Sequence, residues 1–532
     1  MTSKTVGELI RLRAEEQGAS DFFVCDDERL TYADADRRSR ALGRRLVEAG
    51  VGRSSRVGIL FPTGVDFVVT WLAINRIGAA TVPVSTFSKP DELRQIITSS
   101  DTNMLLGVGA YKRHDYVRAL GEAFRGLDLC RADPISCPDA PSLRSVFLSG
   151  GAGVHPSRDL ASFSERESSI SDHMMDAIEA DVRPDDRMVI VYTSGSSGDP
   201  KGVVHQHGAL LAHLENLSVL RGLRPGVKLF SNSPLFWIGG ISYNLAGVLV
   251  AGATLLCSDA PDAGEALDFI ERERPDLVNG YVHSIADLVS HPSFQERDFS
   301  SIRSGNLYPM LPHAIRPADP GLRHNMLGLT ETGGVCLMCP DESDLPERYR
   351  GSFGKPVPDL EARVVDPASG HETGPGELGE LWLRGPFLME GYYGKERHQV
   401  FSTDQWYPTG DLFCVDSDGF FYFKGRRNEV IKTRGANVSP REIEPVMSEL
   451  CGGLPVVVFG VPDAEQDEMV AAAVLASTEV KVDFSGILEE AHSRLSSYKV
   501  PSVLIRIEPN ALPKLSSGKP DLHRLREIVR GR

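Results

Sequence analysis

Residues 192–202 read YTSGSSGDPKG, and this stretch decides how the rest of the chain is organised. The apolar run MVIV at 188–191 precedes it and is typical of a buried strand. Residues 203–220 follow with apolar side chains at helical spacing, so the pattern predicts a strand, a loop and a helix in that order. Glycines allow backbone N–H groups to approach an anion, hydroxyl groups add donors, and Lys201 adds positive charge. The stretch therefore indicates a phosphate-binding loop, although its spacing is not that of a Walker loop.

Composition and charge limit the classes of function. A chain of 532 residues is long enough for about two to four domains with ample core. The formal net charge of −16 argues against nucleic-acid binding, so an anionic nucleotide must be captured by local positive charge. The eight cysteines, including the CxxC pair Cys336 and Cys339, indicate neither a disulfide framework nor a zinc site. We therefore expect a small-molecule enzyme in a reducing cytoplasm.

Two segments bear on membrane insertion. Residues 1–16 are typical of an amphipathic helix and lack the apolar core of a signal peptide. Residues 238–257 carry no charge, but their glycines and polar side chains favour a buried helix followed by a strand. We expect no membrane-spanning segment.

The order of apolar patterns along the chain predicts an α/β fold. Residues 56–60 and 79–84 read as strands with a helix at 66–77 between them, an alternation that favours a parallel sheet flanked by helices. Residues 131–180 show little periodicity and are expected to be loose surface connections. After about residue 345 the pattern becomes β-rich, and a smaller unit follows the glycine and arginine pair at 425–426. We place the domain boundary there and expect domains of 1–426 and 427–532.

The phosphate-loop stretch resembles that of the adenylate-forming superfamily, which includes acyl-CoA synthetases, luciferases and peptide-synthetase adenylation domains. The LTYADAD sequence at 30–36 is similar to the first motif of that superfamily. The resemblance implies a large N-terminal domain of stacked, parallel-type α/β sheets with a small β-barrel-like part. It also implies a small, mobile α+β C-terminal domain that carries a catalytic lysine.

Further motifs resemble the same superfamily in the expected order. Residues 327–331 read LGLTE, which implies that Glu331 holds Mg²⁺ and that Thr330 contacts a nucleotide phosphate. Residues 407–411 read YPTGD, where the resemblance assigns Asp411 to the ribose hydroxyls.

The last two motifs lie in the C-terminal part of the chain. GRRNEVIKTRG at 425–435 is similar to the hinge motif, with Arg426 reaching the ribose or a phosphate and Asn428 at the pivot. PKLSSGK at 513–519 resembles the motif that carries the catalytic lysine, here Lys519.

The implied reaction is attack of a carboxylate on the α-phosphorus of ATP, which releases pyrophosphate and leaves an acyl-adenylate. The small domain would then swing about the hinge so that CoA can form a thioester. Lys519 would bridge the carboxylate and the α-phosphate. The residues implied to cradle the pyrophosphate are Thr193, Ser194, Gly195, Ser196, Ser197, Gly198 and Lys201, and those implied to contact the rest of the nucleotide include Gly305, Asn306, Leu327 and Gly328.

Three positions depart from the superfamily pattern. Asn428 replaces the usual aspartate or lysine of the hinge, which bears on the thioester-forming step. Leu327 replaces an aromatic residue that covers adenine, and residues 304–325 are rewritten around the adenine turn. An enzyme that only adenylates and hands the acyl group to a carrier protein or a separate ligase is therefore an alternative. A luciferase-type oxygenase and a catalytically silent nucleotide-binding relative are further alternatives, and a homodimer is possible.

Residues 232–240, NSPLFWIGG, bear on the substrate. Amino-acid-activating relatives carry an aspartate here for the substrate ammonium, whereas this chain has Trp237 after Phe236, so we expect an acid with an apolar body. Aromatic walls and small glycines favour a bulky ring system such as a terpenoid or steroid acid, and PLFWxGG resembles a branch of actinobacterial acyl-CoA synthetases acting on such acids. A fatty acid or an aryl acid remains open. The predicted acyl pocket comprises Phe236, Trp237, Gly239, Gly240, Tyr243 and Gly333.

Overall fold

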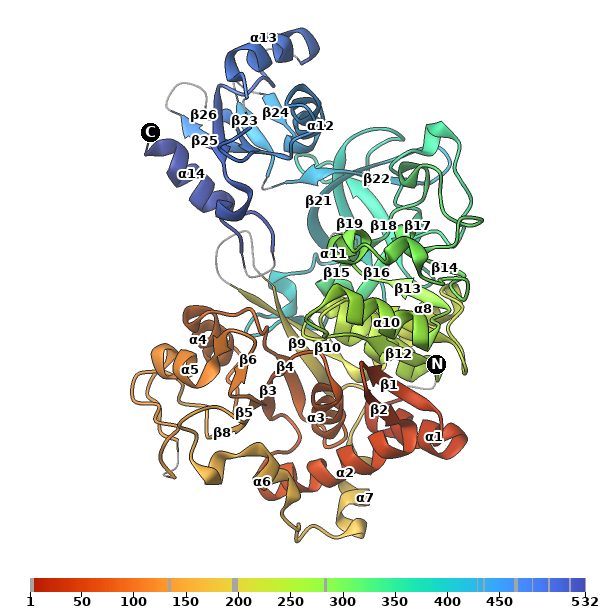
Figure 1. The fold of residues 1–532 in the computed structure, drawn as a ribbon, viewed down its shortest axis with the longest axis vertical. Helices are drawn as coiled ribbons and strands as arrows, with labels where there is room; N and C mark the ends of the chain where they lie inside the picture. The colour runs from red at the N-terminus through yellow and green to blue at the C-terminus, as the bar shows by residue number, and fades with distance from the viewer. Residues whose placement is uncertain are drawn as a thin grey trace. The chain divides into compact units, whose positions relative to one another are not determined.

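The structure is a computed structural model that describes residues 4–132, 135–193, 200–281, 285–427, 429–433, 436–463, 467–480, 482–495, 498–515 and 518–531. The chain divides into two compact units (Figure 1). Unit 1 comprises Met1–Arg350, Gly354–Leu360 and Gly385–Val400, and unit 2 comprises Gly351–Phe353, Glu361–Arg384 and Phe401–Arg532. The boundary expected between residues 426 and 427 lies within unit 2 and stays a prediction.

Unit 1 contains a seven-stranded sheet with the predicted parallel core. The strands β9, β4, β3, β5 and β8 run parallel, and β10 and β20 are added antiparallel at one edge. Their order is β20 (Gly391–Tyr392), β10 (Lys201–Gln206), β9 (Arg187–Thr193), β4 (Ala80–Pro83), β3 (Arg56–Leu60), β5 (Met104–Val108) and β8 (Ser145–Ser149). The expected strands at 56–60 and 79–84 are confirmed to within about two residues, as is the helix between them, α3 (Val65–Asn75).

A six-stranded sheet forms the second layer of unit 1. Its strands are parallel apart from β2, which pairs antiparallel with β1. The order is β14 (Ser304–Gly305), β13 (Leu277–Asn279), β11 (Lys228–Ser231), β12 (Thr254–Cys257), β1 (Asp21–Cys25) and β2 (Glu28–Thr31). A three-stranded sheet of β15 (Leu327–Leu329), β16 (Gly334–Met338) and β17 (Lys355–Pro356) completes the strands that position the site.

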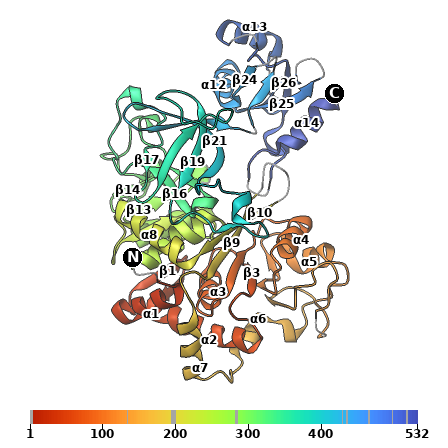
Figure 2. The ribbon, with the colours of Figure 1, turned by 180° about the vertical axis from the view of Figure 1, so that it is seen from behind.

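Helices connect and cover these strands in unit 1. The Thr31 side chain caps α2 (Tyr32–Glu48) by accepting from the backbone of Asp34, which explains why the helix begins at that motif. α4 (Pro90–Ser99) and α5 (Tyr116–Ala123) pack together, away from α1 (Val6–Gln17) and α2 (Figure 1, Figure 2). Further helices of this unit are α8 (His207–Leu220), α9 (Gly247–Ala251), α10 (Ala263–Glu273) and α11 (Ala286–Ser290).

The prediction that residues 131–180 are loose surface connections is wrong for much of the segment. It contains β8, α6 (Leu160–Glu165) and most of α7 (Asp172–Asp181). The buried face of α7 carries Met175 and Glu179, so a charged residue stands where an apolar residue would reveal the helical period.

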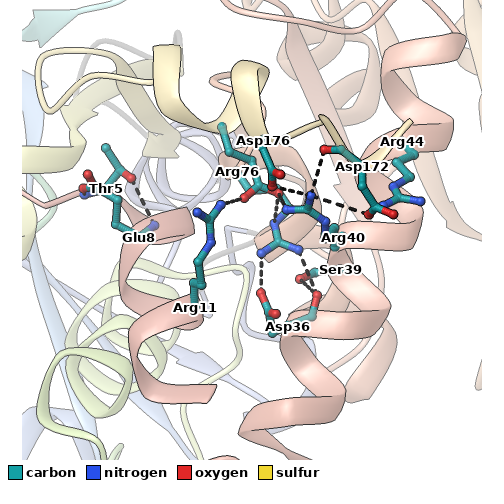
Figure 3. A network of polar contacts seen from close by, with 11 residues as sticks. Thr5, Glu8, Arg11, Asp36, Ser39, Arg40, Arg44, Arg76, Asp172 and Asp176 are labelled. Atoms are coloured by element: carbon teal, nitrogen blue, oxygen red, sulfur yellow. Dashed lines mark hydrogen bonds and ion pairs between the residues drawn. The ribbon is translucent and has the colours of Figure 1, made fainter. Parts of the chain in front are cut away.

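Glu179 is the centre of a charge network between α7 and the N-terminal helices. Its side chain is 2% exposed and contacts Arg11, Arg40 at 3.0 Å and Arg76 at 3.4 Å. The network, whose arginines converge between helices in Figure 3, balances four arginines with four carboxylates: Arg11, Arg40, Arg44 and Arg76 with Asp36, Asp172, Asp176 and Glu179.

Unit 2 contains two further sheets. The β-rich segment forms an open, antiparallel sheet of β18 (Glu361–Val365), β19 (Gly379–Arg384), β21 (Tyr407–Val415) and β22 (Phe421–Arg426). Its edge strands β18 and β22 do not pair with each other, so the expected barrel-like part is not a closed barrel.

The C-terminal segment has the expected α+β character. Strands β23 (Ile431–Thr433), β24 (Ala436–Val438), β25 (Val456–Asp463), β26 (Asp467–Leu475) and β27 (Val503–Ile507) form one sheet. It carries α12 (Pro440–Leu450), α13 (Phe484–Arg494) and α14 (Leu522–Arg530) over apolar clusters on its two faces. Among helices of the described residues in either unit, none is long and apolar enough to cross a membrane.

Candidate active site

The stretch predicted to bind phosphate lies between two strands, not between a strand and a helix. β9 ends at Thr193, and Lys201 begins β10, which returns antiparallel with Thr193 opposite Lys201. Apolar residues at 203–204 fit a helical spacing as well as a strand, and pairing with β9 and β20 decides for the strand. The helix begins only at His207. The predicted loop residues Ser194, Gly195, Ser196, Ser197 and Gly198 lie outside the described residues.

Lys201 opens onto a pocket of about 220 Å³ at the base of this hairpin. Its ammonium lies 5.3 Å from the centre of the Tyr392 ring, within the range of a cation–π contact. The lining combines two lysines with three tyrosines and comprises Ser99, Tyr192, Pro200, Lys201, Gly202, Tyr392, Tyr393 and Lys395. Such a positively charged, hydroxyl-bearing pocket suits an anion.

Thr330 and Glu331 form a single 3₁₀ turn, Thr330–Thr332, after β15. The backbone amide of Met389 donates to the Glu331 carbonyl at 2.9 Å, and His205 Nε2 donates to the Thr330 carbonyl at 2.7 Å. Burial lowers the pKa of His205 to about 4, so the ring is neutral and its proton lies on Nε2, facing the carbonyl. The turn is therefore fixed to β10 and to the segment that precedes β20.

The Glu331 carboxylate is the residue expected to hold Mg²⁺. Tyr392 Oη donates to its Oε1 at 2.9 Å, while Oε2 accepts no hydrogen bond from the described residues. Among all the residues that the structure describes, no group of three or more His, Cys, Asp or Glu side chains converges in a way that could hold a metal ion. A single carboxylate fits Mg²⁺ in particular, because this ion is commonly bound by one or two carboxylates together with substrate phosphates and water.

The residues expected near the adenine lie at the end of β14 and in β15. Gly305 ends β14 with a φ of +136°, and a Cβ there would meet the Val278 carbonyl oxygen at 1.9 Å. The Asn306 side chain accepts from the Gly280 amide at 2.9 Å and donates to the Gly280 carbonyl at 2.8 Å. Asn306 thus ties two loops together with its amide, and a nucleotide contact from it stays a prediction. Leu327 and Gly328 lie in β15, and their contacts with the nucleotide also stay predictions.

Aromatic side chains gather at the predicted acyl pocket. Phe236 and Trp237 meet edge to face at 5.8 Å, just before the π-helical segment Gly239–Ala246. The sequence did not reveal two further members, Phe87 and Tyr281, which lie 5.6 Å from Phe236 and 5.2 Å from Trp237. Both are large apolar residues that remain substantially exposed. Because these two side chains are accessible, the cluster offers exposed aromatic surface that suits a flat, apolar ligand.

The two glycines before the π-helical segment have different surroundings. A Cβ on Gly240 would lie 2.0 Å from the Pro234 carbonyl oxygen, so the backbone leaves no room for a side chain. A Cβ on Gly239 would have ordinary contacts, the nearest being the Tyr281 hydroxyl at 3.6 Å. Of the two, Gly239 is the position at which pocket volume can be varied.

Tyr243 and Gly333 are the other two residues predicted for the acyl pocket. Ser242, the neighbour of Tyr243, donates from its hydroxyl to the Gly333 carbonyl, which joins the π-helical segment to the turn that carries Glu331. Gly333 has a φ of +67°, and a Cβ there would meet Leu210 at 2.2 Å. The Arg221 guanidinium packs over the Tyr243 ring at 3.7 Å, and burial lowers the pKa of Arg221.

Unit 2 brings together the side chains of its own part of the sequence that were expected to bind the nucleotide. Asp411 is 3% exposed in β21 and pairs with Arg426 of β22, whose Nε lies 3.1 Å from Asp411 Oδ1. Lys519 keeps an exposed surface, but surrounding protein partly desolvates its ammonium and, with Arg426 nearby, lowers its pKa. Asp411 and Glu429 act in the opposite direction. Asn428, the expected pivot, lies outside the described residues.

Comparison with known proteins agrees with this arrangement. The model of the family "AMP-binding enzyme" matches residues 10–393. A feruloyl-CoA synthase of an Amycolatopsis species is 29% identical over 92% of both chains, and a 3-hydroxybenzoate–CoA ligase of Aromatoleum sp. (strain CIB) is 28% identical over 94% of this chain and 92% of its own. The crystal structure of the anthranilate CoA ligase AuaEII with anthranoyl-AMP matches the fold with a TM-score of 0.79, at 22% identity over 99% of this chain and 98% of that one.

The chain belongs to the AMP-binding enzyme family. It is an enzyme of the acid–thiol ligase type, and the family activity is ATP-dependent activation of a carboxylic acid through an acyl-adenylate, followed by ligation to CoA. The expected membership of the adenylate-forming superfamily is confirmed.

Proposed function

We propose that this enzyme converts a ring-containing, largely apolar carboxylic acid into its CoA thioester. The observation that carries the proposal is the aromatic cluster of Phe236, Trp237, Phe87 and Tyr281 next to the glycines of the π-helical segment. Flat rings stack on such walls, whereas a substrate ammonium group would need a carboxylate that none of these four side chains supplies.

The residues of unit 1 are assigned to the triphosphate. Lys201 and Thr193, with the loop between them, would hold the β- and γ-phosphates that leave as pyrophosphate, and Thr330 would contact a phosphate. Glu331 would hold Mg²⁺, which when bound neutralises phosphate charge. These groups position ATP and stabilise charge, which is the main protein contribution to transfers at phosphorus.

The residues of unit 2 are assigned to the same nucleotide. Asp411 would accept hydrogen bonds from both ribose hydroxyls, and Arg426 orients its carboxylate. Lys519 would stabilise the charge that builds up as a substrate carboxylate oxygen bonds to the α-phosphorus and the bond to the pyrophosphate oxygen breaks. In the second step the CoA sulfur bonds to the acyl carbon, its proton is lost and AMP leaves.

The class of acid is the finer part of the proposal. The relatives named above act, by their names, on ferulic and hydroxybenzoic acids, which are aryl acids, and the aromatic cluster suits such rings. A bulkier terpenoid or steroid acid would use the same flat walls and stays a candidate, as does a fatty acid. The low cysteine content, eight in 532 residues, together with the ATP and CoA requirement of the proposed reaction, supports a cytoplasmic enzyme.

The test is pyrophosphate release from ATP with aryl, polycyclic, straight-chain and amino acids, followed by thioester detection with CoA. We expect ring acids to have the highest kcat/KM and to give thioesters. Preference for straight-chain acids would refute the substrate proposal. Adenylate without thioester would favour the alternative in which the acyl group passes to a carrier protein or separate ligase. Absence of turnover with every class, with retained ATP binding, would favour a silent relative.

A further inference from the structure

We infer that Tyr392 is a positioning residue that holds the Mg²⁺ carboxylate and the phosphate-loop lysine in fixed relation to each other. The inference rests on the proposed function of Glu331 and Lys201. Tyr392 lies in none of the motifs from which these two residues were predicted, and 61 residues separate it from Glu331.

The backbone of Tyr392 is fixed by the edge of the seven-stranded sheet. In β20 it stands opposite Val203 of β10, two residues beyond Lys201. The flanking amides of Glu390 and Tyr393 donate to the carbonyls of Val204 and Gly202 at 2.8 and 2.7 Å. The Tyr392 side chain therefore starts from a backbone tied to the strand that carries Lys201.

The side chain of Tyr392 contacts both charged groups with different parts of one phenol. Its hydroxyl donates to Glu331 Oε1 at 2.9 Å, and its ring faces the Lys201 ammonium at 5.3 Å. A hydrogen bond to a carboxylate is charge-assisted and stronger than a neutral one, and a ring face attracts a cation without neutralising it.

This arrangement keeps the two charges available for ligands. Among the ion pairs of the described residues, none joins Lys201 to Glu331, although both lie within reach of one tyrosine. With Oε1 engaged by Tyr392, Oε2 is the oxygen of Glu331 without a hydrogen bond in the described chain. Tyr392 thus orients the carboxylate toward Mg²⁺ while the ammonium remains free to meet phosphate.

The test is Tyr392→Phe, which removes the hydroxyl and keeps the ring. Tyr111→Phe is the matched control, because the Tyr111 hydroxyl also donates to a carboxylate, that of Asp259, and its ring also faces an ammonium, that of Lys112 at 4.9 Å, but Tyr111 does not line the Lys201 pocket. Binding of α,β-methylene-ATP is measured by calorimetry with and without MgCl₂. We expect Tyr392→Phe to weaken binding about tenfold with MgCl₂ and less than about twofold without it, because only the carboxylate loses its hydrogen bond.

A second readout is the MgCl₂ dependence of pyrophosphate release. The half-saturating MgCl₂ concentration should rise about tenfold in Tyr392→Phe, with kcat at saturating MgCl₂ within about threefold of the unaltered enzyme. Tyr392→Leu, which also removes the ring, should weaken binding without MgCl₂ as well.

The outcomes separate this inference from the proposed function. If the unaltered enzyme binds the analogue equally with and without MgCl₂, the proposed metal site of Glu331 fails. If that binding depends on MgCl₂ but Tyr392→Phe equals the unaltered enzyme or Tyr111→Phe, the positioning inference alone is overturned. Equal weakening of analogue binding by Tyr392→Phe with and without MgCl₂ also overturns the positioning inference, because a merely structural role would affect both measurements.

Discussion

Glu179→Gln should destabilise unit 1 more than neutralisation of any exposed carboxylate of the same network. The substitution keeps the volume and a carbonyl oxygen but removes the negative charge from a side chain that is 2% exposed. Arg76, which is 0% exposed, and Arg40, which is 19% exposed, then lose a buried counter-charge (Figure 3 shows both arginines). One positive charge of the otherwise balanced network is left uncompensated.

The magnitude follows from burial. Breaking a buried ion pair by removing one partner costs about 3–5 kcal/mol. We expect the lower end, about 3 kcal/mol, because Asp36 still pairs with Arg76 and because Arg11 is 43% exposed. With an unfolding entropy of about 2 cal/mol/K per residue and cooperative unfolding of unit 1, this corresponds to a fall in Tm of about 4 °C.

The assay is thermal unfolding by circular dichroism at neutral pH and low salt. The control is Asp172→Asn, which also neutralises one carboxylate of the network but at a side chain that is 82% exposed. Asp172→Asn should lower the free energy of unfolding by less than about 1 kcal/mol, which corresponds to a fall in Tm of about 1 °C. Equal Tm values for Glu179→Gln and Asp172→Asn would refute the reasoning that burial makes this network important.

The remaining predictions concern pH, the acyl pocket and the catalytic lysine. Burial lowers the pKa of His213 to about 3, whereas this pKa is about 6.5 in the unfolded chain. The contribution of the neutral ring to stability is therefore full above pH 6.5 and is lost as the pH drops toward 3. The fall in Tm between pH 7 and pH 5 should be smaller in His213→Phe than in the unaltered protein. Gly240→Ala should reduce kcat/KM for the acid at least tenfold because its Cβ meets the Pro234 carbonyl, whereas Gly239→Ala should fold normally and raise KM mainly for bulky acids. Lys519→Ala should reduce adenylate formation at least about 100-fold while the Kd for ATP changes by less than about fivefold.

Each of these predictions has a contradicting result. An unchanged pH dependence of Tm in His213→Phe would mean that this ring does not link protonation to unfolding. Equal kinetics of Gly240→Ala and Gly239→Ala would contradict the steric difference between the two glycines. Adenylate formation by Lys519→Ala at the normal rate would assign the charge stabilisation to another residue.

Local patterns were sufficient for much of the fold and for the chemistry of the motifs. Periodicity predicted β3, α3 and β4 because side-chain spacing depends on the backbone of one element, and the parallel sheet followed from their alternation. The motif at 192–202 indicated phosphate binding because its residue types have that chemistry in any fold. The structure then brought Asp411, Arg426 and Lys519, expected separately, into one cluster.

What the tertiary structure alone decided are the contacts between elements far apart in the chain. Residues 203–206 became a strand because β9 and β20 pair with them, and no local pattern could distinguish that from the start of a helix. Tyr392 meets Glu331 and Lys201, and Phe87 meets Phe236, only because sheet register and packing bring these residues together. The sequence by itself thus determined which chemistry the chain carries, because that depends on residue type and spacing. The tertiary structure decided which side chains act on one another, because that depends on distances which only packing sets.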